Sequence, residues 1–344
     1  MIFKDQHVLI TGGTGSLGKT LCKRILSGDR GSPSSVTVLS RDEAKQEFMR
    51  RQFAPDLNRL RFRIGDVRRY DDVLGAMRGM DIVINAAALK QVPSCEYAPE
   101  QALLTNCVGP INIVRAWQNL QGHAPHTVVG VSTDKACEPV NTMGITKALQ
   151  ERIFVSANLE VGKRTQDARF VCVRYGNVLA SRGSVVPLFK EQIAQGGPVT
   201  ITVSTMTRFL LSLSQAADTI FAAIRSAGPG DIYVPRVPAA KMMDVAVALI
   251  GDLPIAIEMM GIRPGEKIHE CLVSDSERYR TRETSGYFVV TPGIPELAWA
   301  NGHIGIGRPY MSCDDVMALS QVKDLLSLHG LIGTPMAQEG ELLA

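Results

Sequence analysis

The segment HVLITGGTGSLG, residues 7–18, decides the expected fold. A short apolar strand, 7–10, leads directly into glycines at positions 12, 15 and 18, and 17–26 then has the pattern of a helix. In such a turn the first glycine permits a tight bend, the second lets the backbone approach a pyrophosphate, and the third allows close helix packing. The helix N-terminus then faces the negative charge. This context predicts a dinucleotide-binding turn formed by Gly12, Thr14, Gly15, Ser16, Leu17 and Gly18.

The composition is that of an ordinary soluble globular protein, with 344 residues, 45% hydrophobic and 21% charged. A net charge of +3, without a dense basic run, argues against a nucleic-acid partner. No apolar run is long enough to span a bilayer and no signal peptide is visible, so we expect a cytoplasmic protein without a membrane anchor. The seven cysteines form no CxxC pair or Cys/His cluster, so neither disulfides nor a metal site is expected.

The strand predicted at 35–39 is followed by Ser40 and Arg41, with Lys45 one helical turn further on. An NAD-selective site would place an acidic residue here to hold the ribose 2′-hydroxyl. A hydroxyl and two cations suit a 2′-phosphate instead, so NADP is favoured over NAD. The alternative is an ordinary solvated helix start.

Two further strands, 61–64 and 81–88, complete the expected cofactor site. Asp66 and Val67 follow the first and would flank the adenine, and Ala86, Ala87 and Ala88 would leave room for the cofactor backbone. The alternation of strands and helices predicts an α/β fold with a Rossmann-type doubly wound parallel sheet in residues 1–175, completed by later segments. We expect a smaller C-terminal substrate-binding lobe mainly in 176–330 and a loosely ordered tail in 331–344.

Two long helices are predicted at 99–121 and 143–162. Pro110 should kink or split the first, because proline lacks the amide donor, and Asn106 should have a structural role there. Both helices are long enough to pair across a two-fold axis, so a homodimer or larger homo-oligomer is expected.

The stretch VSTDKACEPVNTMGITK, residues 131–147, carries the candidate chemistry. A strand ending near residue 131 would project Thr133, Asp134 and Lys135 into the crevice where α/β sheets bind ligands. A surface ion pair is the alternative for Asp134 and Lys135. Met143 and Lys147 lie one helical turn apart on one face. A thioether cannot take a proton, so Met143 is expected to pack rather than to act as a base.

Nine sequence blocks, in order, resemble the UDP-N-acetylglucosamine 4,6-dehydratases (inverting) of the extended short-chain dehydrogenase/reductase superfamily. The blocks are TGGTGSLG (11–18), SRDEAKQ (40–46), GDVR (65–68), AAALKQVPSCEYAP (86–99), VSTDKACEPVNTMGITK (131–147), YGNVLASRGSVVPLF (175–189), MTRF (206–209), IYVPR (232–236) and IRPGEKIHE (262–270). Met143 stands where that superfamily normally has the tyrosine of a Tyr-x-x-x-Lys pair, and Lys147 is the lysine. Lys135 resembles members that invert C5, whereas related enzymes that retain C5 commonly carry glutamate there.

The resemblance implies a reaction that starts with hydride transfer from C4 of the sugar to the nicotinamide. The resulting ketone acidifies the C5 proton, which Lys135 would remove, while protonated Asp134 would donate to the departing C6 hydroxyl. Hydride then returns to C6. Thr133 would bond the 4-oxygen and Lys147 the nicotinamide ribose. To act as a base, Lys135 must be neutral, so burial or a nearby cation such as Lys147 is expected to lower its pKa.

The resemblance also implies a substrate site in the second half of the chain. Asn177 would contact the diphosphate, and Arg208 and Arg263 would clamp the UDP pyrophosphate, because a guanidinium fork binds phosphate oxygens in pairs. Glu266 would bond the uridine ribose, and Val185 would line the site. Lys90 is expected on a loop beyond a strand end, where it could contact the substrate; a solvent-exposed lysine is the alternative. Exposed surface arginines are the alternative for the two clamps.

The leading hypothesis is an NADP-dependent hydro-lyase that converts a UDP-sugar, foremost UDP-N-acetylglucosamine, into a 4-keto-6-deoxy sugar nucleotide with C5 inverted. The alternatives are retention at C5 or a 5,6-ene product, a UDP-sugar 4-epimerase, and a non-catalytic NADP-binding regulator. The base for C4 oxidation stays open among Lys135, Asp134 and a relay through Thr133.

Overall fold

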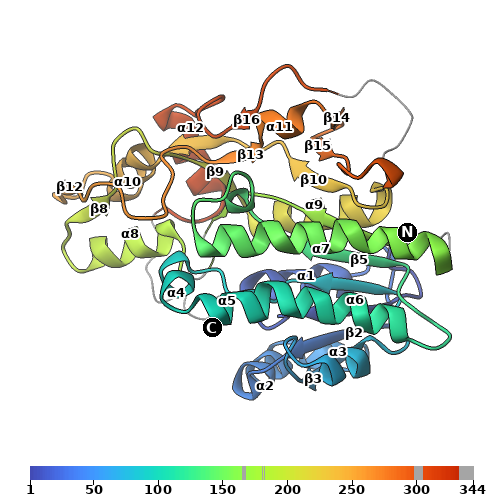
Figure 1. Ribbon diagram of the computed structural model, residues 1–344. Helices are drawn as coiled ribbons and strands as arrows, with labels where there is room; N and C mark the ends of the chain where they lie inside the picture. The colour runs from blue at the N-terminus through green and yellow to red at the C-terminus, as the bar shows by residue number, and fades with distance from the viewer. Residues whose placement is uncertain (165–167, 180, 182, 298–304, 333–344) are drawn as a thin grey trace.

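A nine-stranded sheet forms the centre of the computed structural model, which describes residues 1–164, 168–179, 181, 183–297 and 305–332 (Figure 1). The strand order is β14-β15-β10-β6-β5-β4-β1-β2-β3. Neighbours from β3 to β10 are parallel, and β15 and β14 continue the sheet as an antiparallel pair. The predicted α/β Rossmann-type sheet is confirmed. Its strands are β1 (His7–Thr11), β2 (Ser35–Ser40), β3 (Leu60–Ile64), β4 (Ile82–Asn85), β5 (Thr127–Val131), β6 (Arg169–Val173), β10 (Ile232–Pro235), β14 (Thr281–Thr284) and β15 (Tyr287–Val290).

The inner strands are buried because helices cover both faces of the sheet. On one face α3 packs against α6, and α6 against α7; on the other, α1 packs against α9 (Figure 1). The edge strand β3, LRFRI, alternates apolar and basic residues and is the most exposed of the parallel strands. The helices of this part are α1 (Ser16–Leu26), α2 (Glu43–Gln52), α3 (Tyr70–Met77), α4 (Val92–Tyr97), α5 (Pro99–Leu103), α6 (Gly109–Asn119), α7 (Thr142–Arg164) and α9 (Leu213–Ser226), with the short turns η1 (Ala54–Asp56), η3 (Asp134–Ala136) and η4 (Pro295–Leu297).

The helix predicted at 99–121 is interrupted by a π-helical turn, η2 (Leu104–Val108), directly before α6. Pro110 lies in the first turn of α6, where its missing amide leaves no bond unmade. Asn106 is fully buried in η2; it accepts from the Leu89 amide and donates to the Leu89 carbonyl and the Thr146 hydroxyl. Both the split at Pro110 and the structural role of Asn106 are confirmed.

A second hydrophobic core lies in the smaller lobe, which α8, α10 and α12 build around short strands. Part of the second half nevertheless joins the main sheet, since β10, β14 and β15 come from it. The boundary at residue 175 stays a prediction, and residues 333–344 of the predicted tail lie outside the described residues. The elements of the second half outside the main sheet are β7 (Asn177–Val178), β8 (Val199–Ile201), β9 (Thr207–Leu211), β11 (Ala239–Lys241), β12 (Ile257–Met259), β13 (Cys271–Val273), β16 (Tyr310–Met311), α8 (Val185–Ala194), α10 (Met242–Ile250), α11 (Asp275–Arg278) and α12 (Leu319–Leu328).

Within the described ranges, no helix combines the length and the apolar character needed to cross a membrane. The same part of the chain contains no cluster of three or more His, Cys, Asp or Glu side chains suited to a metal ion.

Candidate active site

The glycine-rich turn lies at the point where the strand order reverses, between the carboxyl ends of β1 and β4. Gly12 has a φ of +67°, and a Cβ there would lie 2.7 Å from Cα of Ala87. At Gly18 a Cβ would lie 2.3 Å from the carbonyl oxygen of Gly13, so α1 could not pack so closely on the turn. The first and third glycines therefore serve the turn and the helix packing that the motif requires.

The N-terminus of α1 has the features of an anion site. Gly15 is its N-cap; among the described residues no side chain caps the helix there, and the first turn contains no acidic residue. A Cβ at Gly15 would meet only the carbonyl oxygen of Gly12, at 3.4 Å, so a ligand can approach the backbone. The amides of this turn, which includes Thr14, Ser16 and Leu17, fit the pyrophosphate of a dinucleotide.

The ends of β2 and β3 bring Arg41 and Asp66 together, with Nη1 of Arg41 3.8 Å from Oδ2 of Asp66. Ser40 is buried and accepts from Gln46, and Lys45 pairs with Asp42 at 2.8 Å. Arg41 is exposed and is thus the cation best placed to meet a ribose phosphate at this edge. Beside this edge Val67 is buried, and Ala86, Ala87 and Ala88 follow β4, which ends earlier than predicted, at Asn85.

Asp66 also bonds Arg68, with 2.6 Å between Oδ2 and Nη2. Burial would raise the pKa of Asp66, but the hydrogen bonds and charge of Arg68, with the charge of Arg41, outweigh it and lower that pKa. The carboxylate can therefore accept the hydrogen bond expected from the adenine amino group.

Thr133, Asp134 and Lys135 leave the end of β5 in the short turn η3. The Thr133 hydroxyl donates to Oδ1 of Asp134 at 2.8 Å, and Nζ of Lys135 lies 3.2 Å from the same oxygen. Asp134 is 1% exposed, and its other oxygen, Oδ2, is buried without a hydrogen-bond partner in the described part of the chain. The structure thus joins the three predicted residues in one group around the buried Asp134 and leaves one of its carboxylate oxygens without a hydrogen bond in the described ranges.

Two glycines let other elements approach this group. A Cβ at Gly144 would lie 2.2 Å from the Lys135 carbonyl oxygen, so α7 begins against η3 only because this residue is glycine. A Cβ at Gly176 would lie 2.6 Å from Cβ of Phe209 and 3.4 Å from Oδ2 of Asp134. Sequence reasoning missed both positions, although each adjoins a residue singled out from the sequence, Met143 and Asn177.

Glu270 is a further residue of this group that sequence reasoning missed. It precedes β13, is 2% exposed, and places Oε1 3.0 Å from Nζ of Lys135. Glu270 is the last residue of the block IRPGEKIHE, in which it follows several basic residues. The sequence does not show which lysine this glutamate contacts. Lys135 is therefore held between two carboxylates.

The expected lowering of the Lys135 pKa is wrong for this arrangement. Burial would lower that pKa, but the charges of Asp134 and Glu270 outweigh it and raise the pKa above its ordinary value. The cation that opposes them is Arg208, whereas Lys147 donates to Oε1 of Gln150 at 2.7 Å. Burial lowers the pKa of Lys147 itself to about 8.

Met143 is buried in a small apolar cluster with Cys95 and Ala102, between α7 and the helices α4 and α5. Its thioether therefore packs, as predicted, and gives no proton acceptor at the position of the usual tyrosine.

Apart from Lys90, the predicted substrate residues lie in the second half of the chain, and not all of them are presented to a ligand. Arg208 is buried, and its guanidinium donates to the carbonyls of Thr207, Lys267 and Ile268. In this arrangement its guanidinium holds the 262–270 loop in place, and its N–H groups are not presented to a pyrophosphate. Arg263 is exposed on that loop, and Glu266 accepts from the Thr202 hydroxyl at 3.2 Å.

Two buried oxygen atoms without a hydrogen-bond partner among the described residues lie at the start of the smaller lobe. Oδ1 of Asn177 and Oγ of Ser184 are buried and have no hydrogen-bond partner among the residues described. Ser184 is the N-cap of α8, and Val185 is its half-buried first residue. Lys90 is exposed on the loop after β4. Unpaired buried polar groups are rare, so Asn177 and Ser184, like Asp134, are positions at which a ligand would supply a missing hydrogen bond.

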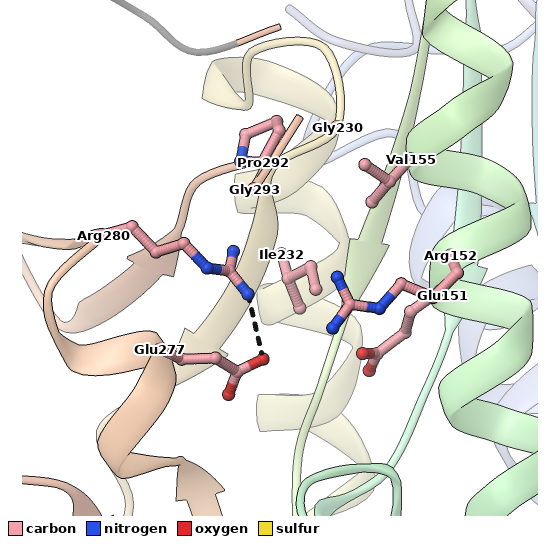
Figure 2. Close-up of a pocket in the computed structure, with 9 residues that line it drawn as sticks. All are labelled: Glu151, Arg152, Val155, Gly230, Ile232, Glu277, Arg280, Pro292 and Gly293. Carbon is pink, nitrogen blue, oxygen red and sulfur yellow. Dashed lines mark hydrogen bonds and ion pairs between the residues drawn. The ribbon is translucent and has the colours of Figure 1, made fainter. Parts of the chain in front are cut away.

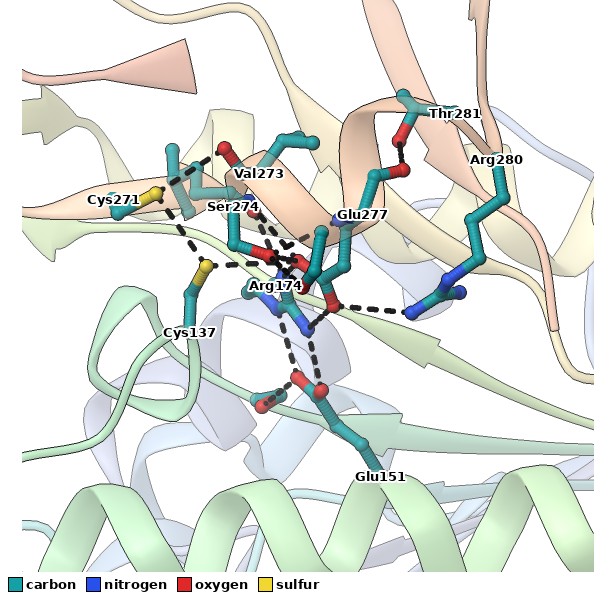
Figure 3. A network of polar contacts seen from close by, with 12 residues as sticks. Cys137, Glu151, Arg174, Cys271, Val273, Ser274, Glu277, Arg280 and Thr281 are labelled. Atoms are coloured by element: carbon teal, nitrogen blue, oxygen red, sulfur yellow. Dashed lines mark hydrogen bonds and ion pairs between the residues drawn. The ribbon is translucent and has the colours of Figure 1, made fainter. Parts of the chain in front are cut away.

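A buried ion network centred on Arg174 lies next to the site (Figure 3). Arg174, which follows β6, binds Glu151 of α7 at 2.6 Å and Glu277 of α11 at 2.8 Å. The Ser132 hydroxyl, one residue before Thr133, donates to Glu151 at 2.6 Å. The network therefore ties α7 and α11 to the ends of β5 and β6, next to Thr133, Asp134 and Lys135.

A small pocket beside this network is a separate feature (Figure 2). It lies between Glu151 and Arg152 of α7 on one side and Glu277 and Arg280 on the other, with Glu277 and Arg280 3.4 Å apart. None of the predicted cofactor or substrate residues lines it. The pocket therefore has no part in the candidate active site.

A Rossmann-type sheet, a glycine-rich turn at its switch point and a lysine-bearing helix packed against β5 and β6 define an α/β dinucleotide-binding protein of the short-chain dehydrogenase type. Residues 8–292 match the family described as "Polysaccharide biosynthesis protein". The chain belongs to this family, within the dehydratases of the extended short-chain dehydrogenase/reductase superfamily, which confirms the resemblance drawn from the sequence blocks.

Two curated relatives carry different activities in their names. The UDP-N-acetylglucosamine 4,6-dehydratase (inverting) of Campylobacter jejuni is 40% identical over 295 residues, 85% of each chain. The UDP-glucose 4-epimerase of Rickettsia prowazekii is 39% identical over 336 residues, 94% of this chain and 96% of the relative.

Among solved structures, Pen from Bacillus thuringiensis superposes with a TM-score of 0.87 and 33% identity, covering 96% of this chain and all (100%) of that one. DesIV, a dTDP-glucose 4,6-dehydratase from Streptomyces venezuelae solved with NAD bound, has a TM-score of 0.66 at 20% identity, covering 76% of this chain and 86% of its own. The second likeness shows the fold alone.

Proposed function

We propose that this protein is an NADP-dependent 4,6-dehydratase of UDP-N-acetylglucosamine that yields a 4-keto-6-deoxy sugar nucleotide with C5 inverted. One observation carries the proposal: a buried acid, Asp134, and a partly buried amine, Lys135, lie together at the end of β5, and one acidic oxygen there has no partner in the described structure. The elimination needs a base that takes the C5 proton and an acid that protonates the C6 hydroxyl of the same sugar. Epimerisation at C4 needs no acid at C6. The dehydratase name of the Campylobacter jejuni relative supports the same reaction.

The cofactor supplies what no side chain can, a hydride acceptor for C4 that later returns the hydride to C6. The glycine turn fits its pyrophosphate, Arg41 would hold a 2′-phosphate, and Asp66 would hold the adenine. Lys147 would bond the nicotinamide ribose. The exposed cation at position 41 in place of an acid favours NADP.

Lys135 and Asp134 would share the elimination. After C4 is oxidised, the C5–H bond breaks and its proton passes to the Lys135 amine; the C6–O bond breaks and the hydroxyl leaves as water with the Asp134 proton. When hydride reaches C6, a proton from solvent would be added to C5 on the face opposite to Lys135, and Lys135 would release the proton it took to solvent. The balance is the loss of one water, without net oxidation. Thr133, bonded to Asp134, would hold the 4-oxygen.

The group that accepts the C4 hydroxyl proton is Lys135, Asp134 or a relay through Thr133, and Met143 is excluded by its chemistry. Asn177, Lys90, Val185, Arg263 and Glu266 would bind the UDP moiety, and Arg208 would join them if substrate entry released its guanidinium from the 262–270 loop.

The proposal includes a cytoplasmic homodimer or larger homo-oligomer. The observation that favours it is a set of exposed apolar side chains on α5 and α7, among them Leu103 (47% exposed), Ile145 (55%) and Leu149 (44%). A division into a cofactor-binding domain, 1–175, and a mainly substrate-binding lobe, 176–330, belongs to the same proposal.

A UDP-sugar 4-epimerase is the second candidate, because relatives covering 94% of the chain bear the name UDP-glucose 4-epimerase. Incubation with UDP-N-acetylglucosamine in deuterated water separates the two. Dehydration gives a product lighter by one water, before the label is counted, with deuterium at C5. Epimerisation leaves the mass unchanged, and that result would overturn the proposal. Proton couplings around C5 distinguish inversion from retention.

The replacement Lys135→Ala should abolish deuterium incorporation at C5 while NADP binding is retained, because the side chain is the proposed base and touches no predicted cofactor residue. Exchange is followed by mass spectrometry and NADP binding by calorimetry. Continued exchange in the variant would assign the base to another group.

A further inference from the structure

Glu270 is a buried acid for which the proposed chemistry has no direct use. Its Oε1 lies 3.0 Å from Nζ of Lys135 and 3.7 Å from Nε of Arg208, and its backbone amide donates to the Ser312 hydroxyl at 2.9 Å. Its second oxygen, Oε2, is buried and lacks a hydrogen-bond partner in the described ranges. Burying an ionised carboxylate is costly unless it is paired. The burial of Glu270 beside Lys135 therefore calls for a functional explanation.

The groups around Lys135 form a balanced set of two acids and two cations. Asp134 approaches its amine from η3, Glu270 from the segment before β13, and Arg208 from β9. The amine thus lies between carboxylate oxygens at 3.2 and 3.0 Å, one from its own turn and one from the smaller lobe's loop. Removing either acid would leave the lysine side chain, which has four rotatable bonds, held from one side only.

We propose that Glu270 is a positioning residue that orients the Lys135 amine and keeps it protonated until substrate enters. The catalytic part of this inference rests on the proposed function, but the ion pair itself does not. Transfer of one proton from Nζ to the adjacent Asp134 would then produce a neutral amine and a carboxylic acid, the two forms that the elimination requires. The N–H bond breaks, an O–H bond forms, and no other reactant is needed.

Burial opposes the charge on Lys135, but the two carboxylates outweigh it and raise the Lys135 pKa. Removal of one of them should therefore be visible in the titration of the amine.

The direct test measures that titration in the ligand-free protein. In protein labelled with ¹⁵N-lysine, the side-chain signal missing from Lys135→Ala identifies Lys135. In Glu270→Gln, which keeps the shape and removes the charge, this signal should titrate at least about one pH unit lower than in the wild type. The exposed Glu47, replaced in Glu47→Gln, is the matched control and should leave it unchanged. An unchanged Lys135 titration in Glu270→Gln would overturn the proposal.

A second variant keeps the test decisive if Glu270→Gln does not fold. Glu270→Asp retains the charge and withdraws it by one methylene, so the Lys135 titration should move in the same direction by a smaller amount. A titration identical to that of the wild type would again contradict the positioning role.

The reaction provides an independent readout. In Glu270→Gln the acidic limb of the pH profile for C5 deuterium incorporation should shift to lower pH, while the KM for UDP-N-acetylglucosamine changes less than about twofold. A merely structural role would lower the rate equally at every pH. If the wild-type protein does not exchange C5 at all, the proposed function fails, and the lysine titration still decides the role of Glu270.

Discussion

Individual side chains in this protein acquire their chemistry from partners distant in sequence. Lys135 would be an ordinary surface amine if its turn were exposed, but Glu270 and Asp134 hold it in a buried ion pair. Arg41 is the opposite case. Its guanidinium stays exposed, and a contact with Asp66, which is distant in sequence, orients it. At this scale the chemical question is which charges remain available to a ligand.

Replacing Arg41 with alanine should weaken NADP binding about tenfold, equivalent to about 1.4 kcal/mol, and leave NAD binding nearly unchanged. The reason is that, under the proposed function, the exposed guanidinium of Arg41 would meet the 2′-phosphate, which NAD lacks. Calorimetric titration with both dinucleotides measures the effect, with Arg51→Ala on the same edge of the molecule as control. Equal losses for both cofactors would contradict the assignment.

Among the secondary-structure elements, the 262–270 loop is held against the segment between η3 and α7 by hydrogen bonds. Asn141, just before α7, donates to the Gly265 carbonyl at 2.7 Å, and Lys267 donates to the Cys137 carbonyl at 2.6 Å. Beneath them, Arg174 joins β6, α7, β13 and α11. The site is therefore assembled where these elements meet, and its geometry depends on their packing.

Arg174→Met should lower the free energy of unfolding by roughly 3 to 5 kcal/mol, because it leaves the carboxylates of Glu151 and Glu277 buried without their cation. Urea denaturation followed by circular dichroism measures the change. The matched control, Arg236→Met, removes an exposed ion pair with Glu283 and should cost less than about 1 kcal/mol. Similar losses in the two variants would show that the Arg174 network does not stabilise the fold.

At the scale of the whole molecule, the ion network makes stability depend on pH. Burial alone would raise the pKa of Glu277, but the charge and hydrogen bonds of Arg174 outweigh it and lower that pKa to about 2 from an ordinary value of 4.5. A group whose pKa is lower in the folded state stabilises that state at pH values above the unfolded pKa. The stabilisation is lost as the pH falls from about 4.5 towards 2.

This shift predicts that acidification across that window removes about 3 kcal/mol of folding free energy through Glu277. Urea denaturation at intervals from pH 7 to pH 3 measures the greater part of this loss, about 2 kcal/mol. In Glu277→Gln the protein should be less stable at pH 7, and its stability should change less with acidification. A wild-type stability that is flat down to pH 3 would refute the prediction.

Local patterns in the sequence determined much of this architecture. The glycine turn, the parallel strands and the polar residues after β5 follow from short-range steric and hydrophobic requirements, which neighbouring residues express. Hence the Rossmann sheet, the split at Pro110 and the apolar packing of Met143 were all predicted correctly. The nine family blocks also identified the family, because their order and spacing carry information that single motifs lack.

Only the tertiary structure decided which charges meet. It paired Lys135 with Glu270, turned Arg208 towards backbone carbonyls, and made the Lys135 pKa rise where a fall was expected. A pKa depends on desolvation and on every charge within a few ångströms, and those charges come from η3, β9 and the 262–270 loop, far apart along the chain. Such long-range contacts leave no periodicity in the sequence, so they can be read only from the folded molecule.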